Sequence, residues 1–178
     1  INPLSSLAYY KDKAVVNTII ASFSPSYKIT DDLEYKFLYS VNRQVGIRKG
    51  MADRRLNLDN VLDHGTAFIG NNEQTNQQIT NTLNYNKEVS SGFNVNALVG
   101  HEWLIFNNRN NFMAGKDFDN IGLNYYDYIQ QGLTANRAIG SYASPTTELQ
   151  SFFARAILNL QDKYLITGTF RADGSTRF

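Results

Sequence analysis

Long stretches of this chain alternate between apolar and polar residues, and this alternation constrains the fold more than any other feature. From residue 15 to 29, and again from 33 to 41, the odd-numbered positions are mostly apolar or aromatic. A period of two places successive side chains on opposite faces of a β-strand. Thr30-Asp31-Asp32 separates the two runs and predicts a β-hairpin. Its strands are about ten residues or longer, against about 5–6 in typical globular proteins, and Pro25 favours an edge or a bulge.

Two further hairpins follow the same pattern. One spans residues 79–99 around a turn at 87–92, and the other runs from Leu149 around the turn Gln161-Asp162-Lys163. Residues 46–74 and 107–147 lack the alternation, so we expect two long loops there, with one helical turn or a short strand near Tyr125. Three hairpins with short turns and long connections are typical of outer-membrane barrels, whereas long loops are uncommon in compact soluble β-domains.

The aromatic residues and the overall composition agree with a β-rich chain. The 178 residues include 11 Tyr, 11 Phe and 21 Asn, a mixture that favours strands and polar loops. Five aromatic residues lie near the short turns on the apolar faces, where an interfacial girdle is expected: Tyr27, Tyr35, Tyr85, Phe93 and Tyr164. The strand pattern alone also fits a β-sandwich whose apolar face packs a core.

Composition excludes several classes of function. The chain has no Cys, which excludes disulfide scaffolds, zinc ribbons and thiol catalysis. Its 17 basic and 16 acidic residues argue against a dedicated nucleic-acid binder, and no apolar run is long enough for a transmembrane helix. His64 and His101 have no ligand-spaced neighbours, and no G-x-S-x-G motif occurs. We therefore expect no catalytic residues, no metal site, no cofactor and no enzymatic activity, and we expect Asp117-Phe118-Asp119-Asn120 to be a solvated loop rather than a calcium loop.

Three C-terminal motifs carry a family resemblance. They are Ser151-Phe152-Phe153-Ala154-Arg155, Asp162-Lys163-Tyr164-Leu165, and the segment from Arg171 to Phe178. In this order and spacing they resemble the SusC/RagA family of TonB-linked outer-membrane proteins of Bacteroidetes. The motif residues are Arg155, Asp162, Lys163, Tyr164, Arg171, Asp173, Gly174, Ser175, Arg177 and Phe178.

The resemblance extends upstream, with a few departures. It continues through Asn2-Pro3-Leu4, the turn at residues 29–33, and the hairpin segments 81–87 and 94–100. Asp32 and Ala154 stand where the family usually has glycine, and Ala172 stands where arginine is common.

The resemblance implies a fold and a function. The fold is an all-β, antiparallel, up-and-down transmembrane β-barrel with long extracellular loops, of which this chain supplies about six strands out of 22. The implied function is TonB-dependent import of oligosaccharides or peptides across the outer membrane, with a SusD-like surface lipoprotein and the TonB complex as partners and no nucleic acid. We expect residues 1–178 to be an internal barrel fragment without plug domain or remaining strands, because open sheet edges cannot face lipid. A secreted β-rich carbohydrate-binding or adhesive module is the alternative.

Residue parity assigns the two faces of the predicted strands. Odd positions at 15–41 and 79–99 and even positions at 152–170 are expected to face lipid. The lumen-facing candidates are Glu34, Lys36, Asn94, Asn96, Arg155, Thr167, Thr169 and Arg171. Arg171, Asp173 and Arg177 are expected to form an ion-pair network at the extracellular end of the last strand, with contact to a substrate as the alternative.

Three tyrosines lie in the second long loop. Tyr125, Tyr126 and Tyr128 are candidate contacts for a ligand or for the lid protein, or else they pack the loop onto the barrel.

Overall fold

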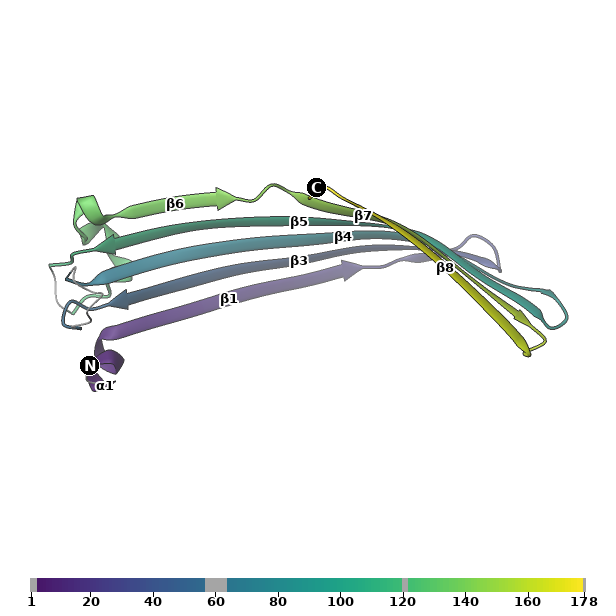
Figure 1. Ribbon diagram of the computed structural model, residues 1–178, viewed down its shortest axis with the longest axis horizontal. Helices are drawn as coiled ribbons and strands as arrows, with labels where there is room; N and C mark the ends of the chain where they lie inside the picture. Colours follow the sequence, from purple (N-terminus) through teal and green to yellow (C-terminus); the bar gives the residue numbers. More distant parts are fainter. Residues whose placement is uncertain (1–2, 57–63, 120–121, 178) are drawn as a thin grey trace. The chain divides into compact units, whose positions relative to one another are not determined.

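The computed structural model describes residues 3–56, 64–119 and 122–177. These residues form an eight-stranded antiparallel sheet (Figure 1), which confirms the predicted all-β class. The main strands, in their order across the sheet, are β1 (Tyr10–Phe23), β3 (Leu33–Ala52), β4 (Thr66–Ser90), β5 (Phe93–Lys116), β7 (Thr147–Leu160) and β8 (Tyr164–Ser175). Consecutive strands are neighbours in this order, as in an up-and-down topology, and β1 and β8 lie at its two ends.

Two short strands and four short helices complete the described elements. β2 (Ser26–Lys28) pairs with β3, and β6 (Ala138–Ala143) pairs with β5. Helix α1 (Pro3–Tyr9) precedes β1, and three 3-10 turns follow β5: η1 (Tyr125–Asp127), η2 (Ile129–Gln131) and η3 (Thr134–Asn136). No helix in the described ranges is both long and apolar enough to cross a membrane. Asn2, Asn120 and Phe178, named in the sequence motifs, lie outside the described residues.

The predicted hairpin turns are confirmed in place, but the second is shorter than the expected 87–92, because β4 continues to Ser90. Gln161 and Asp162 have positive φ angles of 54° and 52°, which close the β7–β8 turn. Gly92 has a φ of 76° at the β4–β5 turn, a conformation that glycine adopts without strain. Pro25 interrupts the strand between β1 and β2, and its carbonyl accepts a hydrogen bond from the Phe37 N–H at 3.1 Å.

The two predicted long loops are wrong in extent. β3 continues to Ala52, β4 begins at Thr66 and β5 continues to Lys116, so strands occupy much of residues 46–74 and 107–147. Amides and glycines fill both faces of these strand ends, for example at Asn71 and Asn72, so no alternation marks them. The backbone ladder does not depend on side-chain polarity and therefore continues. Helix α1 was also not predicted.

The chain divides into two compact units. Unit 1 comprises residues 1–18, 44–74 and 108–144, and unit 2 comprises residues 19–43, 75–107 and 145–178. The buried hydrophobic residues of the described chain all belong to unit 1: Met51, Ala52, Leu56, Ala67, Phe118 and Tyr125. In unit 2, among its described residues, only Ser151 is buried. Unit 2 is therefore a single layer of sheet with no core of its own, although a sheet normally needs a second layer against its apolar face.

Side-chain contacts in unit 2 identify which residues share a face. The His101 and Phe152 rings lie 4.7 Å apart, and the Tyr35 hydroxyl donates to the Asn81 Oδ1 at 2.6 Å. Tyr35, Asn81 and Phe152 belong to the set that parity assigns to lipid, and His101 continues the same odd parity just beyond the predicted range. The predicted grouping by parity is confirmed at these contacts, while the orientation of that face toward lipid stays a prediction.

Candidate functional site

A polar cluster joins four strands in unit 2. We call Gln78, Glu102, Ser151, Arg171 and Asp173 the Arg171 cluster. The Arg171 Nε donates to Asp173 at 2.9 Å, and its Nη2 donates to the Ser151 Oγ at 3.0 Å and to Glu102 at 3.3 Å. Gln78 donates to the other Glu102 oxygen at 2.8 Å. The cluster therefore links β4, β5, β7 and β8 by hydrogen bonds between side chains.

An aromatic ring lies beneath the arginine of this cluster. The Arg171 guanidinium carbon is 5.8 Å from the centroid of the Phe153 ring. Phe153 is paired with Gly100 in the β5–β7 register, and a Cβ on Gly100 would lie 2.3 Å from the ring. Gly100 therefore provides the space in which Phe153 lies against β5. Two of the C-terminal sequence motifs thus meet here, one supplying Ser151 and Phe153 and the other supplying Arg171 and Asp173.

The predicted ion-pair network is confirmed in part. Arg171 and Asp173 form the expected pair, at 2.9 Å. Arg177 instead donates its backbone N–H to the Ser175 Oγ at 3.2 Å, and the second acid of the network is Glu102. Sequence reasoning missed Glu102, although its even number gives it the same parity as Asn94 and Asn96.

The remaining lumen-facing candidates lie along β3, β5, β7 and β8. Glu34 and Lys36 of β3 form an ion pair of 3.2 Å. Arg155 is opposite Thr169 and also opposite Leu98, and Thr167 is opposite Ile157. The other pairs are Asn94 with Asn159 and Asn96 with Ile157. The structure places these residues along strands of unit 2 and does not gather them into one site.

In unit 1, one of the loop tyrosines is a packing residue. Tyr125 is 1% exposed, and its ring stacks on Phe118 with centroids 4.3 Å apart and an interplanar angle of 4°. The stack packs against Met51 and Ala67, and burial raises the pKa of the Tyr125 hydroxyl. The interpretation of Tyr125 as a ligand or lid contact is therefore corrected: its ring packs the loop onto the strands.

The other two tyrosines are more accessible. The Lys49 ammonium lies 4.5 Å from the centroid of the Tyr126 ring and 3.1 Å from the Asp127 carboxylate. Tyr128 is 42% exposed, so its ring is available to a partner. Tyr128 is the member of the predicted trio whose exposure best suits a contact.

A buried carboxylate lies beside the same loop. Asp53 is 3% exposed and accepts two hydrogen bonds from the Arg55 side chain, at 2.8 and 2.9 Å. The Arg55 guanidinium, which also lies 4.4 Å from the Tyr9 ring centroid, holds the pKa of Asp53 below its ordinary value. This ion pair fixes the end of β3 beside α1.

The two histidines each contact a single neighbouring side chain among the contacts described here. His64 lies 3.5 Å from Asp117, and His101 contacts Phe152. Across residues 3–56, 64–119 and 122–177, no three His, Cys, Asp or Glu side chains are arranged to hold a metal ion.

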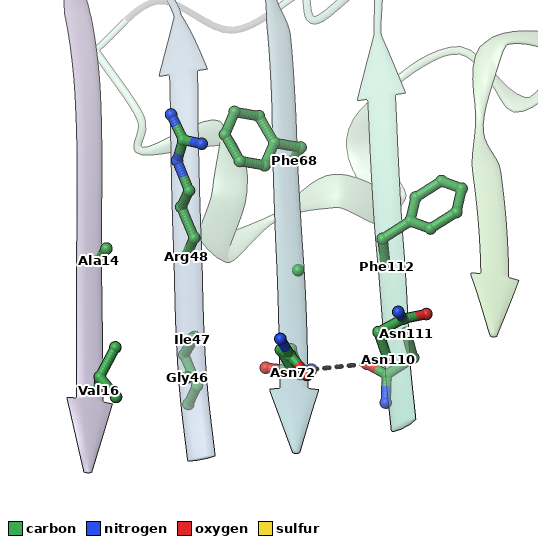
Figure 2. A pocket seen from close by; sticks show the side chains of 12 residues that line it. Ala14, Val16, Gly46, Ile47, Arg48, Phe68, Asn72, Asn110, Asn111 and Phe112 are labelled. Atoms are coloured by element: carbon green, nitrogen blue, oxygen red, sulfur yellow. Dashed lines mark hydrogen bonds between the residues drawn. The ribbon is translucent and has the colours of Figure 1, made fainter. Parts of the chain in front are cut away.

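One groove of unit 1 lies on the sheet itself. This groove has a volume of about 460 Å³, which is within the range of ligand pockets, about 300–1,000 Å³. Figure 2 shows strands β1, β3, β4 and β5 crossing it, with Phe68 and Phe112 turned away from each other. Arg48 and the amides Asn72 and Asn110 also line the groove.

Sequence reasoning missed the groove because it predicted loops at residues 46–74 and 107–147. Extending the predicted strands into these ranges would have placed four even-numbered residues on strands: Phe68, Asn72, Asn110 and Phe112. The sequence signal for the groove is that glycines lie close to aromatic residues. Loops have the same composition, so the sequence alone does not distinguish the two.

Comparison with known proteins shows matches along nearly all of the chain. It is 28% identical over 180 residues to TonB-dependent receptor P3 of Formosa agariphila, and 31% identical over 183 residues to TonB-dependent receptor SusC of Bacteroides thetaiotaomicron. Each alignment covers 99% of this chain and 17% of the relative, so the chain spans about a sixth of their length. Both relatives are named receptors rather than enzymes. No protein-family model matches the chain.

Solved structures show the same fold. A chain in the structure of the RagAB peptide transporter aligns with a TM-score of 0.85 at 17% identity, covering 96% of this chain and 19% of that one. The RagAB importer in its open-open state gives a TM-score of 0.81 at 19% identity, covering 96% and 18%. The strand arrangement of this chain therefore occurs within much longer proteins.

Proposed function

Because this chain is a relative of the SusC/RagA-type TonB-dependent receptors over 99% of its length, we propose that residues 1–178 form part of the barrel wall of such a receptor. The near-complete alignment is the observation that carries this proposal. The single-layer sheet of unit 2 supports it, because unit 2 buries only Ser151 among its described residues. A barrel wall has lipid on one side and a filled lumen on the other, so it needs no core within the sheet.

The activity that follows is energised nutrient import across the outer membrane. In this proposal the receptor takes up oligosaccharides or peptides, and a SusD-like lipoprotein covers its extracellular opening. The relative named SusC supports this assignment, as does the fold shared with the RagAB peptide transporter. In this proposal the chain contributes wall and loop surface, while the coupling to TonB belongs to other parts of the receptor.

Uptake in the source bacterium tests the proposal. We would delete the gene that encodes the chain and measure uptake of fluorescently tagged oligosaccharide and peptide mixtures, with the wild-type gene restored as control. The expected result is loss of uptake of one class, with the same loss when TonB is inactivated. Normal uptake of both classes in the deletion strain, or uptake that is lost but does not depend on TonB, would contradict the proposed function.

Fractionation and affinity capture test the location and the partner. A tagged receptor should appear in the outer-membrane fraction and should retain a lipoprotein encoded beside its own gene. Recovery in the culture medium, without detergent, would favour the secreted binding module instead.

A further inference from the structure

We propose that the groove of unit 1 is a binding site for a neutral, ring-bearing ligand of the carbohydrate class. This inference rests on the proposed import function and adds to it a location and a charge preference. The site is built from three aromatic side chains, two glycines that leave its floor open, two available amides and one arginine whose charge is neutralised by a neighbouring carboxylate.

The aromatic side chains provide flat apolar surfaces. Phe112 is 50% exposed, and Tyr142, also on this side of the sheet, is 59% exposed and pairs with the groove residue Asn110. The Phe112 ring lies over Gly140, where a Cβ would be 2.3 Å from it. The Phe68 ring points away from Phe112 and toward Arg48 (Figure 2). The Arg48 guanidinium lies 5.7 Å from the centroid of the Phe68 ring. Aromatic faces suit the apolar faces of sugar rings, which carry C–H groups.

Glycine leaves the floor of the groove open. A Cβ on Gly70 would meet no atom within 4 Å, although Gly70 lies between Phe68 and Asn72 on β4. Gly46 is similarly spacious on β3, where the nearest atom to a Cβ would be 3.7 Å away, on Val16. A ligand ring can therefore approach the backbone of both strands.

The loop of unit 1 does not cover this side of the sheet. Ala67 packs against Phe118 and Tyr125 of the loop. Because successive strand residues point to opposite faces, Phe68 and Gly70 face away from the loop. The groove is thus accessible within unit 1.

Charge and hydrogen-bonding capacity indicate a neutral ligand. Arg48 forms two hydrogen bonds with Asp12, at 3.1 and 2.6 Å, which neutralise the guanidinium. The side chains of Asn72 and Asn110 are exposed and have no hydrogen bond to the other described side chains. Amides that can both donate and accept suit hydroxyl groups. A charged peptide or an acidic sugar would lack a free counter-charge in this groove.

A filled-groove variant of the full-length receptor tests the site. Gly70→Leu places a side chain in open space, and Gly168→Leu on β8 is the matched control because a Cβ there also meets no atom within 4 Å. The probes are an equimolar mixture of neutral hexasaccharides (maltohexaose, cellohexaose, laminarihexaose, mannohexaose and xylohexaose), a galacturonate hexamer and a mixture of hexapeptides. Retention by the detergent-purified receptor is read by native mass spectrometry.

The expected result is retention of at least one neutral hexasaccharide in preference to the other probes. Gly70→Leu should weaken this binding about ten-fold or more, while Gly168→Leu leaves it unchanged. The inference is overturned if wild-type receptor retains no neutral hexasaccharide, if it prefers the peptides or the galacturonate, or if Gly70→Leu binds as wild type does.

A charge variant provides a second test. Asp12→Asn leaves Arg48 without its neutralising partner, so retention of the galacturonate hexamer should rise several-fold. Unchanged retention would overturn the assigned charge preference. TonB-dependent uptake, measured separately in cells, distinguishes the two levels of proposal. If Gly70→Leu takes up substrate as well as wild type does, only the proposed binding site in the groove is contradicted. If uptake by the wild-type receptor does not depend on TonB, the proposed import function is contradicted.

Discussion

Gly100 decides how β5 and β7 approach each other at one point in unit 2. Any side chain there would meet the Phe153 ring, which in turn lies beneath Arg171. A β-branched residue at position 100 would displace the ring and disturb the hydrogen bonds that Arg171 makes. The effect of this contact can be measured in the proposed receptor.

We predict that Gly100→Val lowers the stability of the folded protein by about 1–3 kcal/mol, the usual cost of overpacking. Phe153→Ala should recover part of this loss when combined with it, because the clashing ring is removed. The measurement is the temperature at which the folded form disappears on heat-shift gels. Gly168→Val, in open space, is the control. A fully additive double variant would show that Phe153 is not the residue that Gly100 accommodates.

A second prediction concerns the two faces of β7. Arg155 and Ala156 are adjacent and both exposed in the described chain, and they point to opposite sides. If the even side faces lipid, Ala156→Arg costs about 2–4 kcal/mol near the membrane midplane, and Arg155→Ala costs much less. Refolding yields into detergent micelles and bilayers measure the difference. Equal losses for both variants would refute the assignment of faces.

At the scale of elements, the loop after β5 is held mainly by packing. Phe118 and Tyr125 are 2% and 1% exposed. The ion pair between Lys49 and Asp127 is partly exposed to solvent, and such pairs contribute about 0–1 kcal/mol. The aromatic stack therefore dominates the docking of this segment.

We predict different effects for two variants of this loop. Tyr125→Ala removes a buried ring, a change that costs about 3–5 kcal/mol in a core, and should undock the loop. Lys49→Ala should leave it docked. Limited proteolysis between residues 117 and 137 provides the measurement, with faster cleavage expected only for Tyr125→Ala. Faster cleavage of Lys49→Ala alone would mean that charge, and not packing, holds the loop.

The end of β3 should respond to acid. The pKa of Asp53 lies below its ordinary value of 3.8, because Arg55 stabilises the carboxylate. A depressed pKa in the folded state gives stability that is present above the ordinary value and is lost as pH falls through the folded value. Hydrogen-exchange protection of residues 50–56 should therefore be constant down to about pH 4 and should decline below it.

Asp53→Asn is the matched variant for this acid response. It cannot ionise, so its protection should lack the acidic decline. An identical decline in both proteins would show that another group is responsible.

At the scale of the molecule, exposed apolar residues dominate the outer strands of unit 2. Ile19, Ile20, Leu165, Ile166 and Phe170 are between 64% and 70% exposed. β1 and β8 end the strand order, so each offers an edge to which a further strand can pair. These features suit a barrel wall with neighbours on both sides.

We therefore predict that residues 1–178, expressed alone, aggregate in water and become dispersed only with detergent. Size-exclusion chromatography with and without detergent measures this. A monodisperse, detergent-free monomer would favour the secreted binding module over the barrel wall.

The hairpins illustrate what local pattern can predict. The turn at Gln161 and Asp162 and the parity set that includes Tyr35 and Asn81 follow from neighbours in the chain. The groove around Phe68 and Phe112 was missed for the converse reason, because polar strand ends carry no alternation although their backbone ladder continues.

The sequence by itself determined the strand class, the order of the hairpins, the grouping of residues by face and the family resemblance. These depend on periodicity and on motifs, which are local. Only the tertiary structure decided that Glu102 meets Arg171, 69 residues away, that Tyr125 is buried, and that Gly70 lies in an open groove. Such contacts depend on the register between strands and on how a loop folds back, and both are fixed by packing across the sheet rather than along the chain.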